Sequence, residues 1–183
     1  MRPPSNNPKP QSPSPVRRRG AGGRAVAHRQ RLPERILPGD LLLSESVIPA
    51  ATIEAYLATD YQVHAPEPFV LKIGRASPEL AHWFKRSRTD SAIFITAWNP
   101  WSEPTSAPEN AAAQQQLLAE IKARGLPYLD GEGRDASGRW PGEPSLLVFG
   151  ILLEAAKKLA RRFRQNGLVY AVSDAIPRLI LLR

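Results

Sequence analysis

The chain has 183 residues, no cysteine and a formal net charge of +8, which fits one domain with an additional tail. The lack of cysteine excludes disulfides and thiolate metal sites, and no stretch approaches the roughly 18 apolar residues that a membrane span needs. The N-terminus also lacks the apolar segment of a secretory signal. We therefore predict a soluble, cytoplasmic protein that does not interact with a membrane.

Most of the positive charge lies in residues 1–40. Nine basic and two acidic residues give this segment +7, which leaves +1 for residues 41–183. Eight prolines and sparse apolar residues predict a disordered basic tail, because such a segment cannot bury enough apolar surface to offset the entropy of ordering. The run Arg17-Arg18-Arg19 indicates nucleic-acid binding; the alternatives are a solvated tail without a partner and a translation start near Leu43 or Val47.

From about residue 41 the sequence changes to periodic apolar patterns. The spacing of Ile53, Tyr56 and Leu57 predicts a short helix over 49–59 with these side chains on one inner face. Alternating apolar and polar residues predict two half-buried strands, over 61–65 and 69–73. A serine followed by proline predicts a helix start at Ser77-Pro78. The side chains expected on the inner face of that helix are Leu80, Trp83 and Phe84.

The middle of the chain begins with a continuous apolar run over 92–98, which predicts a central strand buried on both faces. Ser106 and Glu109 fit a capping box, so a helix is expected from there to Gly125. A short strand is expected at Tyr128. Four glycines and two prolines then predict a long loop over 130–144.

A second strongly apolar strand is expected over 145–152, followed by a helix whose inner face carries Ala155, Leu159 and Phe163. Two final strands are expected over 168–172 and 178–182. Strands and helices do not alternate regularly, so we predict an α+β fold: a single domain over 41–183 with a mixed β-sheet and about four helices packed on it.

Five short motifs occur in a fixed order along this domain: Ile95-Thr96-Ala97-Trp98-Asn99-Pro100, Glu109-Asn110, Gly131-Glu132-Gly133-Arg134-Asp135, Trp140-Pro141-Gly142-Glu143-Pro144-Ser145 and Phe163-Arg164-Gln165-Asn166. Together they resemble the bacterial domain-of-unknown-function family 3293, over roughly residues 54–183. The resemblance implies a shared fold unit and shared positions, and it carries no assigned activity.

Polar residues at the ends of the predicted elements suggest a ligand pocket, because ends of central strands and starts of helices are where such scaffolds build sites. The pocket would be formed by the Asn99-Pro100 turn, the helix start at Asn110 and the loop Gly131–Glu143. The candidate ligand-binding residues, including two from the last motif of the family resemblance, are Asn99, Asn110, Trp140, Ser145, Gln165 and Asn166. The weaker catalytic candidates are Glu132, Asp135 and Glu143, because a carboxyl pair with separated pKa values can do acid–base work.

Each of these residues also has a purely structural explanation. Asn99-Pro100 is a common turn former, Glu109 is explained by capping, and Asn166-Gly167 is a helix stop. Small-molecule binding, with or without catalysis, remains the first hypothesis. The second hypothesis is nucleic-acid binding, which the next paragraph describes. The third is a protein-interaction domain whose exposed tryptophans contact a partner.

The last predicted helix has a basic face formed by Lys157, Lys158, Arg161 and Arg162. With the arginines of the tail it could hold phosphates of a nucleic acid. The alternative is a solvated face whose cations favour the C-terminal end of the helix dipole.

Several sharper motifs fail, so neither a metal nor a cofactor is expected. Glycines near Gly131 resemble a dinucleotide fingerprint, but Gly138 and Pro141 follow where its helix should start. Asp135 stands where a calcium loop requires glycine, and no pair of histidines has zinc-ligand spacing. A Ser145–His64–Asp triad lacks the surrounding nucleophile motif, and the alternating strand places His64 toward solvent.

Overall fold

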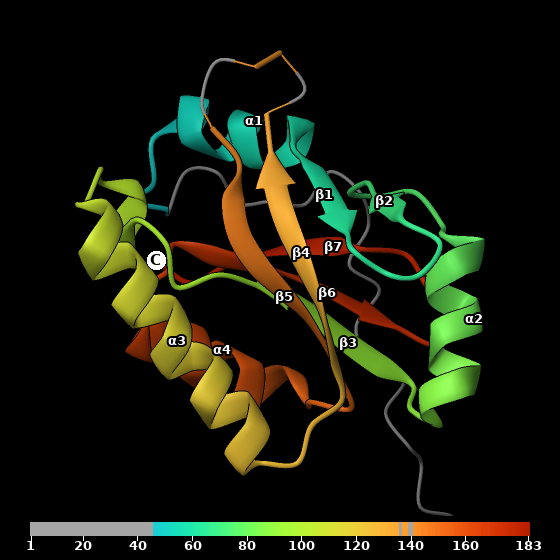
Figure 1. The fold of residues 1–183 in the computed structure, drawn as a ribbon. Helices are drawn as coiled ribbons and strands as arrows, with labels where there is room; N and C mark the ends of the chain where they lie inside the picture. The colour runs from blue at the N-terminus through green and yellow to red at the C-terminus, as the bar shows by residue number, and fades with distance from the viewer. Residues whose placement is uncertain (1–45, 136, 139–140) are drawn as a thin grey trace, which may run out of the picture. The chain divides into compact units, whose positions relative to one another are not determined.

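Four α-helices and seven strands are present in the part of the chain that the computed structural model describes, residues 46–135, 137–138 and 141–183 (Figure 1). In chain order they are α1 (Ala50–Ala58), β1 (Asp60–Val63), β2 (Phe69–Leu71), α2 (Pro78–Ser87), β3 (Ser91–Ile95), a 3₁₀ turn (Pro100–Ser102), α3 (Ala107–Ala123), β4 (Tyr128–Arg134), β5 (Glu143–Phe149), α4 (Leu153–Arg162), β6 (Gly167–Val172) and β7 (Arg178–Leu181). The predicted α+β class with four helices is confirmed. The predicted tail lies outside the described residues, and within those residues no helix is long and apolar enough to cross a bilayer.

The strands form one sheet in the order β2-β1-β4-β5-β3-β6-β7, and every neighbouring pair is antiparallel. The prediction of a mixed sheet is therefore wrong, because every neighbouring pair of strands is antiparallel. The reason lies in the helical connections. α3 joins β3 to β4 and α4 joins β5 to β6, but in each case a third strand lies between the two strands that the helix connects.

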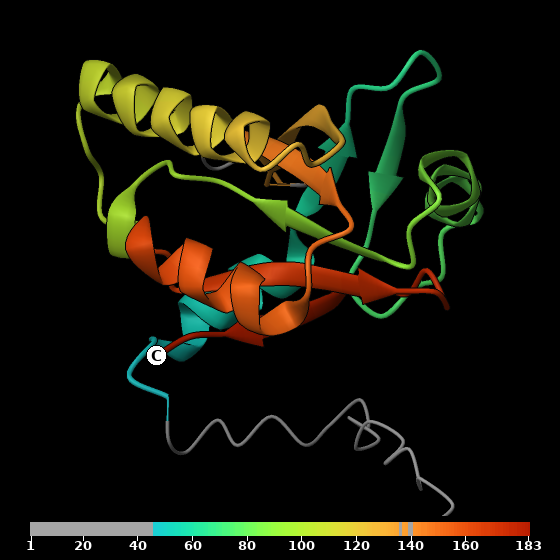
Figure 2. The same cartoon turned by 90° about the horizontal axis from the view of Figure 1, so that it is seen from below.

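The central part of the sheet has the split βαβ connectivity of a ferredoxin-like unit, β3-α3-β4-β5-α4-β6. Its two helices, α3 and α4, lie side by side on one face of the sheet (Figure 2). α2 packs on the other face, where the strands β1 and β2 at one edge of the sheet contribute to the same core. This arrangement places the end of β3 next to the start of β5, where the polar candidates lie.

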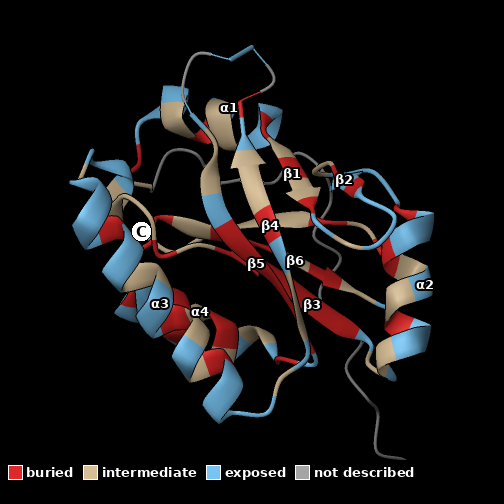
Figure 3. Cartoon of the chain, viewed as in Figure 1, coloured by how far each residue is buried: buried red, intermediate tan, exposed pale blue. Residues whose placement is uncertain are grey.

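Each face of the sheet has its own hydrophobic core, as the buried stretches of β3 and β5 show (Figure 3). The core beneath α3 and α4 includes Ile93, Ile95, Leu117, Leu146, Val148 and Leu159. The core on the opposite face includes Val63, Leu71, Phe84, Phe94, Leu147 and Phe149. Residues from β1 and β2 share this second core with β3 and β5, so the sheet curls over it. Consecutive residues of β3 therefore serve different cores, as expected for a strand buried on both faces.

The starts of α2 and α3 have the predicted serine caps. The Ser77 hydroxyl accepts a hydrogen bond from the Leu80 N–H at 3.1 Å, and the Ser106 hydroxyl accepts from the Glu109 N–H at 3.4 Å. α1 has no side-chain cap, and only Ile53 of this helix is buried. The prediction that Leu57 packs inward is wrong, because its side chain is 46% exposed.

The loop predicted over 130–144 is shorter than expected, because β4 extends to Arg134 and β5 begins at Glu143. Gly131 explains the difference. A Cβ atom at this position would lie 2.6 Å from the Gln62 carbonyl oxygen and 2.8 Å from Phe94 Cε2. Glycine is required here because the backbone of β1 and a core ring approach the strand closely, and not because the chain turns.

We predict that Gly131→Ala lowers the free energy of unfolding by about 1–3 kcal/mol, the usual cost of overpacking a core. Gly133→Ala is the matched control in the same strand, because the nearest atoms to its Cβ would be 3.8 and 4.0 Å away. Urea unfolding of both variants measures the difference. Equal stabilities would show that the close approach at Gly131 does not constrain β4.

Candidate functional site

A cavity of about 480 Å³ lies between α1 and one end of the sheet, where β3 stops and β5 and β6 begin. Figure 1 shows α1 at this end, beside the end of β4 and the start of β5. The residues that line the cavity and are used below are Ala51, Ala55, Tyr56, Tyr61, Phe94, Trp98, Asn99, Ser102, Glu143, Ser145, Gln165, Val169 and Leu179. The structure therefore brings four of the predicted site residues together: Asn99, Glu143, Ser145 and Gln165.

The chain enters a left-handed turn directly after β3. Asn99, Trp101 and Ser102 have φ values of 47°, 60° and 60°. This backbone conformation costs roughly 1–2 kcal/mol for most residues and less for asparagine. The Trp101 N–H donates to the Arg164 carbonyl at 2.7 Å, which ties the turn to the end of α4. Strain of this kind persists only where the surroundings fix it, and here it brings Asn99 and Ser102 to the cavity wall.

Two asparagines at this turn form a hydrogen-bonded pair with only one possible orientation. The side-chain Oδ1 of Asn110 accepts a hydrogen bond from the Asn99 backbone N–H at 2.7 Å, so the side-chain Nδ2 of Asn110 must face the other way as a donor. It donates to the side-chain Oδ1 of Asn99 at 2.9 Å. That oxygen also accepts from the Thr105 N–H at 3.1 Å. The side-chain nitrogen of Asn99 is thereby directed at Glu143, and it donates to Oε1 of that carboxyl group at 2.7 Å.

Asn110 is 2% exposed and supports the cavity from behind. Its amide nitrogen also donates to the Thr105 carbonyl at 3.1 Å, so both of its polar atoms are used within the protein. Its position at the start of α3, where Ser106 caps the helix, fixes it relative to the turn. We conclude that Asn110 positions Asn99, and Asn99 positions Glu143.

Glu143 is half-buried at the start of β5, and burial raises the pKa of its carboxyl group above the ordinary value of 4.5. The hydrogen bond from Asn99 acts in the opposite direction but is the smaller effect. Burial also raises the pKa of the Tyr61 phenol, with a further contribution from the negative charge of Glu143. Among the described residues no hydrogen bond reaches Oε2 of Glu143. The carboxyl group is therefore oriented by one oxygen and has the other available.

A second polar cluster links α1 to the strained turn. The Tyr56 and Ser102 hydroxyls are hydrogen-bonded to each other, and the Asn166 amide group donates to them at 3.3 and 3.2 Å. Asn166 is 5% exposed, and its side-chain oxygen has no partner among the described residues. Gln165 donates to the carbonyls of Trp98 and Phe163 at 3.1 and 3.2 Å. Asn166 and Gln165 therefore hold residues of the cavity wall by hydrogen bonds, in addition to following the end of the helix.

The three carboxyl groups proposed as catalytic candidates are not brought together. In the β4–β5 register Gly133 pairs with Glu143, whereas Glu132 pairs with Pro144, so alternation places Glu132 on the other face of the sheet. There Glu132 forms an ion pair with Arg134 at 3.0 Å. It lines a smaller hollow beside α3.

Two further candidates lie after β4. Asp135 is 4% exposed and its carboxylate accepts hydrogen bonds from the backbone and hydroxyl of Ser137, at 3.2 and 2.6 Å. Such bonds are typical of an aspartate that shapes a turn. Trp140 lies outside the described residues. Within the described part of the chain no three or more His, Asp and Glu side chains lie together in a group that could hold a metal ion.

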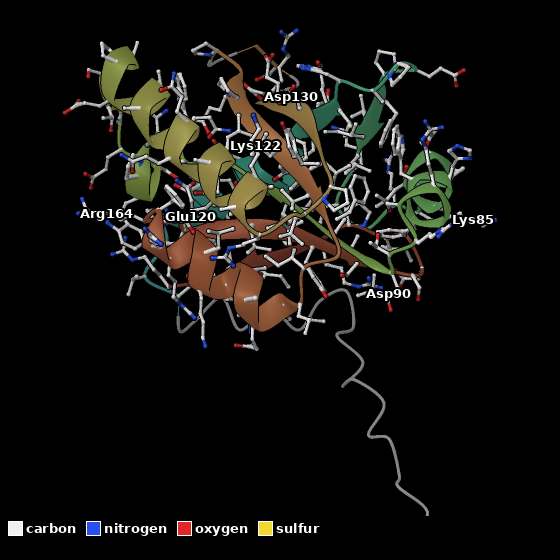
Figure 4. All side chains as sticks on the ribbon, turned by 60° about the horizontal axis from the view of Figure 1, so that its bottom comes forward. Lys85, Asp90, Glu120, Lys122, Asp130 and Arg164 are labelled. Carbon is white, nitrogen blue, oxygen red and sulfur yellow. The ribbon has the colours of Figure 1, made fainter. Side chains whose placement is uncertain are left out.

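The basic face of the last helix is partly neutralised by acidic neighbours. Lys157 pairs with Glu154 at 2.8 Å, and Arg162 pairs with Glu120 of α3 at 2.7 Å. Figure 4 labels Glu120 and Arg164 at the side where α3 and α4 lie next to each other. Lys158 and Arg161 are exposed, while Arg17, Arg18 and Arg19 lie outside the described residues. Nucleic-acid binding by these residues stays a prediction.

The cavity wall formed by α1 was not predicted from the sequence. Ala51 and Ala55 of this helix line the cavity together with Tyr56, which had been assigned to an inner apolar face. Two alanines at a spacing of four, next to a tyrosine, are the only signal in the sequence. Since alanines at this spacing are common in any helix, that signal does not identify a cavity wall.

Comparison with protein families confirms the resemblance indicated by the motifs. Residues 95–168 match the family described as "Protein of unknown function (DUF3293)". This segment runs from the last residue of β3 into the start of β6, so it includes Asn99, Asn110 and Glu143 but not α1. Neither the curated proteins nor the solved structures contain a match to the chain.

We predict that Glu143→Gln raises the thermal midpoint at pH 7 and that this gain fades as the pH falls below about 4.5. The folded protein holds the Glu143 proton more tightly than the unfolded chain does, so wild-type stability falls as the pH rises from 4.5 through the folded-state pKa. Glutamine keeps an oxygen for the Asn99 amide but carries no buried charge.

Thermal unfolding from pH 4 to pH 8 measures this difference. Glu132→Gln is the control, because Glu132 is paired with Arg134 on the other face of the sheet. A difference between Glu143→Gln and wild type that does not change with pH would contradict the assignment of a buried charge to Glu143.

Proposed function

Since the family matched by residues 95–168 is described without an activity, we propose a function from the cavity itself: this protein binds a small organic molecule between α1 and the sheet. The observation that carries the proposal is the series of hydrogen bonds from Asn110 through Asn99 to Glu143. These bonds orient one carboxyl group in an otherwise largely apolar cavity.

The size and lining of the cavity support the proposal. Small-molecule sites usually have volumes of about 300–1,000 Å³, with mostly apolar walls and a few placed polar groups. The cavity of about 480 Å³ falls in this range. Phe94 and Trp98 supply flat walls, and Val169 and Leu179 supply aliphatic ones.

The polar groups have the arrangement expected of a binding site formed before the ligand arrives. Side chains that only satisfy local backbone groups would use all their atoms within the protein, as Asn110 does. Glu143 differs, because Asn99 orients its Oε1 while no described residue bonds to its Oε2. A ligand that bonds to Oε2 would not have to reorganise the site, which favours binding.

The geometry supports binding better than acid–base catalysis by a carboxyl pair. Such catalysis needs two titratable groups that reach the same substrate. Glu132 lies on the other face of the sheet, and Asp135 bonds to Ser137 in a turn. Glu143 is the only carboxyl group among the described residues that line the cavity.

Binding can be tested with N-phenyl-1-naphthylamine, a neutral dye whose fluorescence rises in apolar surroundings. We predict that Ala55→Phe abolishes dye binding by the full chain, because the new ring occupies the cavity. Ala58→Phe, on the same helix but away from the cavity lining, is the matched control and should bind the dye as wild type does.

Circular dichroism and thermal unfolding should show that both variants remain folded. The same dye affinity in the Ala55→Phe variant and in wild type would overturn the proposal, because the dye would then bind elsewhere.

A further inference from the structure

We propose that the ligand of this cavity is an organic cation, a molecule with an ammonium group that pairs with Glu143 and a hydrocarbon part that lies against the aromatic walls. The inference rests on the proposed function, and it adds the chemical class of the ligand. Charge, aromatic lining and hydrogen bonding each support it.

The described lining of the cavity carries charge of one sign. Among the described lining residues Glu143 has the only carboxyl group, and none of them is a lysine, arginine or histidine. Asn99 orients the carboxylate but is neutral, so it does not compensate the charge. Burying a carboxylate without a counter-ion is costly, and burial accordingly raises the pKa of Glu143. A cationic ligand would supply the missing counter-ion, whereas a phosphate or carboxylate ligand would add repulsion.

Among the described residues, four aromatic side chains line the same cavity: Tyr56, Tyr61, Phe94 and Trp98. The rings of Tyr61 and Phe94 meet edge to face, with centroids 5.3 Å apart and planes at 73°. Aromatic faces attract cations within about 6 Å, and aromatic cages are the usual binding sites for substituted ammonium groups. A cavity that holds both aromatic rings and one carboxylate therefore suits an ammonium group that carries methyl or methylene substituents.

The remaining hydrogen-bonding capacity points the same way. Oε2 of Glu143 accepts no hydrogen bond from a described residue, and an ammonium N–H or a polarised C–H next to nitrogen could approach it. Ala51, Ala55, Val169 and Leu179 add apolar surface for the hydrocarbon part of the ligand. The phenols of Tyr56 and Tyr61 are the other titratable groups of the described lining, and neither carries a positive charge in any protonation state.

Four probes of similar shape test the inference on the full chain by isothermal titration calorimetry at pH 7: benzyltrimethylammonium, benzylamine, benzyl alcohol and benzoate. We expect at least one of the two cations to bind ten-fold or more tightly than benzyl alcohol, and benzoate to bind most weakly. In the Glu143→Gln variant the preference for the cation should disappear. Glu132→Gln is the matched control and should keep the preference, because that carboxylate lies on the other face of the sheet.

The outcomes separate this inference from the proposed function. If Ala55→Phe abolishes binding of the neutral dye, but the wild-type protein binds the cations no more tightly than benzyl alcohol, the inference fails and the binding function stands. If a cation preference persists in Glu143→Gln, the inference also fails, because the charge would be recognised elsewhere. If dye binding is unaffected by Ala55→Phe, the binding function itself fails.

Discussion

The site depends on one hydrogen bond, from the Asn99 side chain to Glu143 at 2.7 Å. This bond has a fixed direction, because backbone N–H groups donate to the oxygens of both Asn110 and Asn99 and so determine which atom of each amide faces onward. The constraint therefore passes from the backbone through two neutral side chains to a carboxyl group. The backbone of the turn after β3 is strained, and this strained conformation places Asn99 where its side chain can orient Glu143.

The fold brings the residues of this hydrogen-bond series together from distant parts of the sequence. β3 and β5 are neighbours in the sheet, so the turn after β3 lies beside the start of β5, where Glu143 is found. α3 starts a few residues beyond the turn and holds Asn110 behind it. α1 then covers the cavity on the remaining side, while Asn166 joins that helix to the turn through the Tyr56 and Ser102 hydroxyls. The split connectivity of the central strands thus builds the site as well as the core.

Local patterns in the sequence predicted most elements because their signals are local. Apolar runs identified β3 and β5, and the serines at positions 77 and 106 identified two helix starts. Asn99, Glu143 and Ser145 could be assigned to a common site because they lie at the ends of such elements, and Gln165 because it belongs to a motif of the family resemblance. The length of β4 could not be predicted, because glycine is required at position 131 by the close approach of Gln62 and Phe94, which are distant in sequence. For the same reason the antiparallel strand order and the wall formed by α1 required the structure.

We conclude that Asn99 orients a half-buried carboxyl group at Glu143, which has no counter-ion among the described residues. A carbon-13 NMR titration of the Glu143 carboxyl carbon, in wild type and in Asn99→Gly, tests it most directly; glycine accepts the left-handed backbone at this position. We predict a pKa above 4.5 in wild type, and a higher pKa in the variant because the hydrogen bond that favours the charged form is lost. A wild-type pKa at or below 4.5, or the same pKa in both proteins, would contradict the claim.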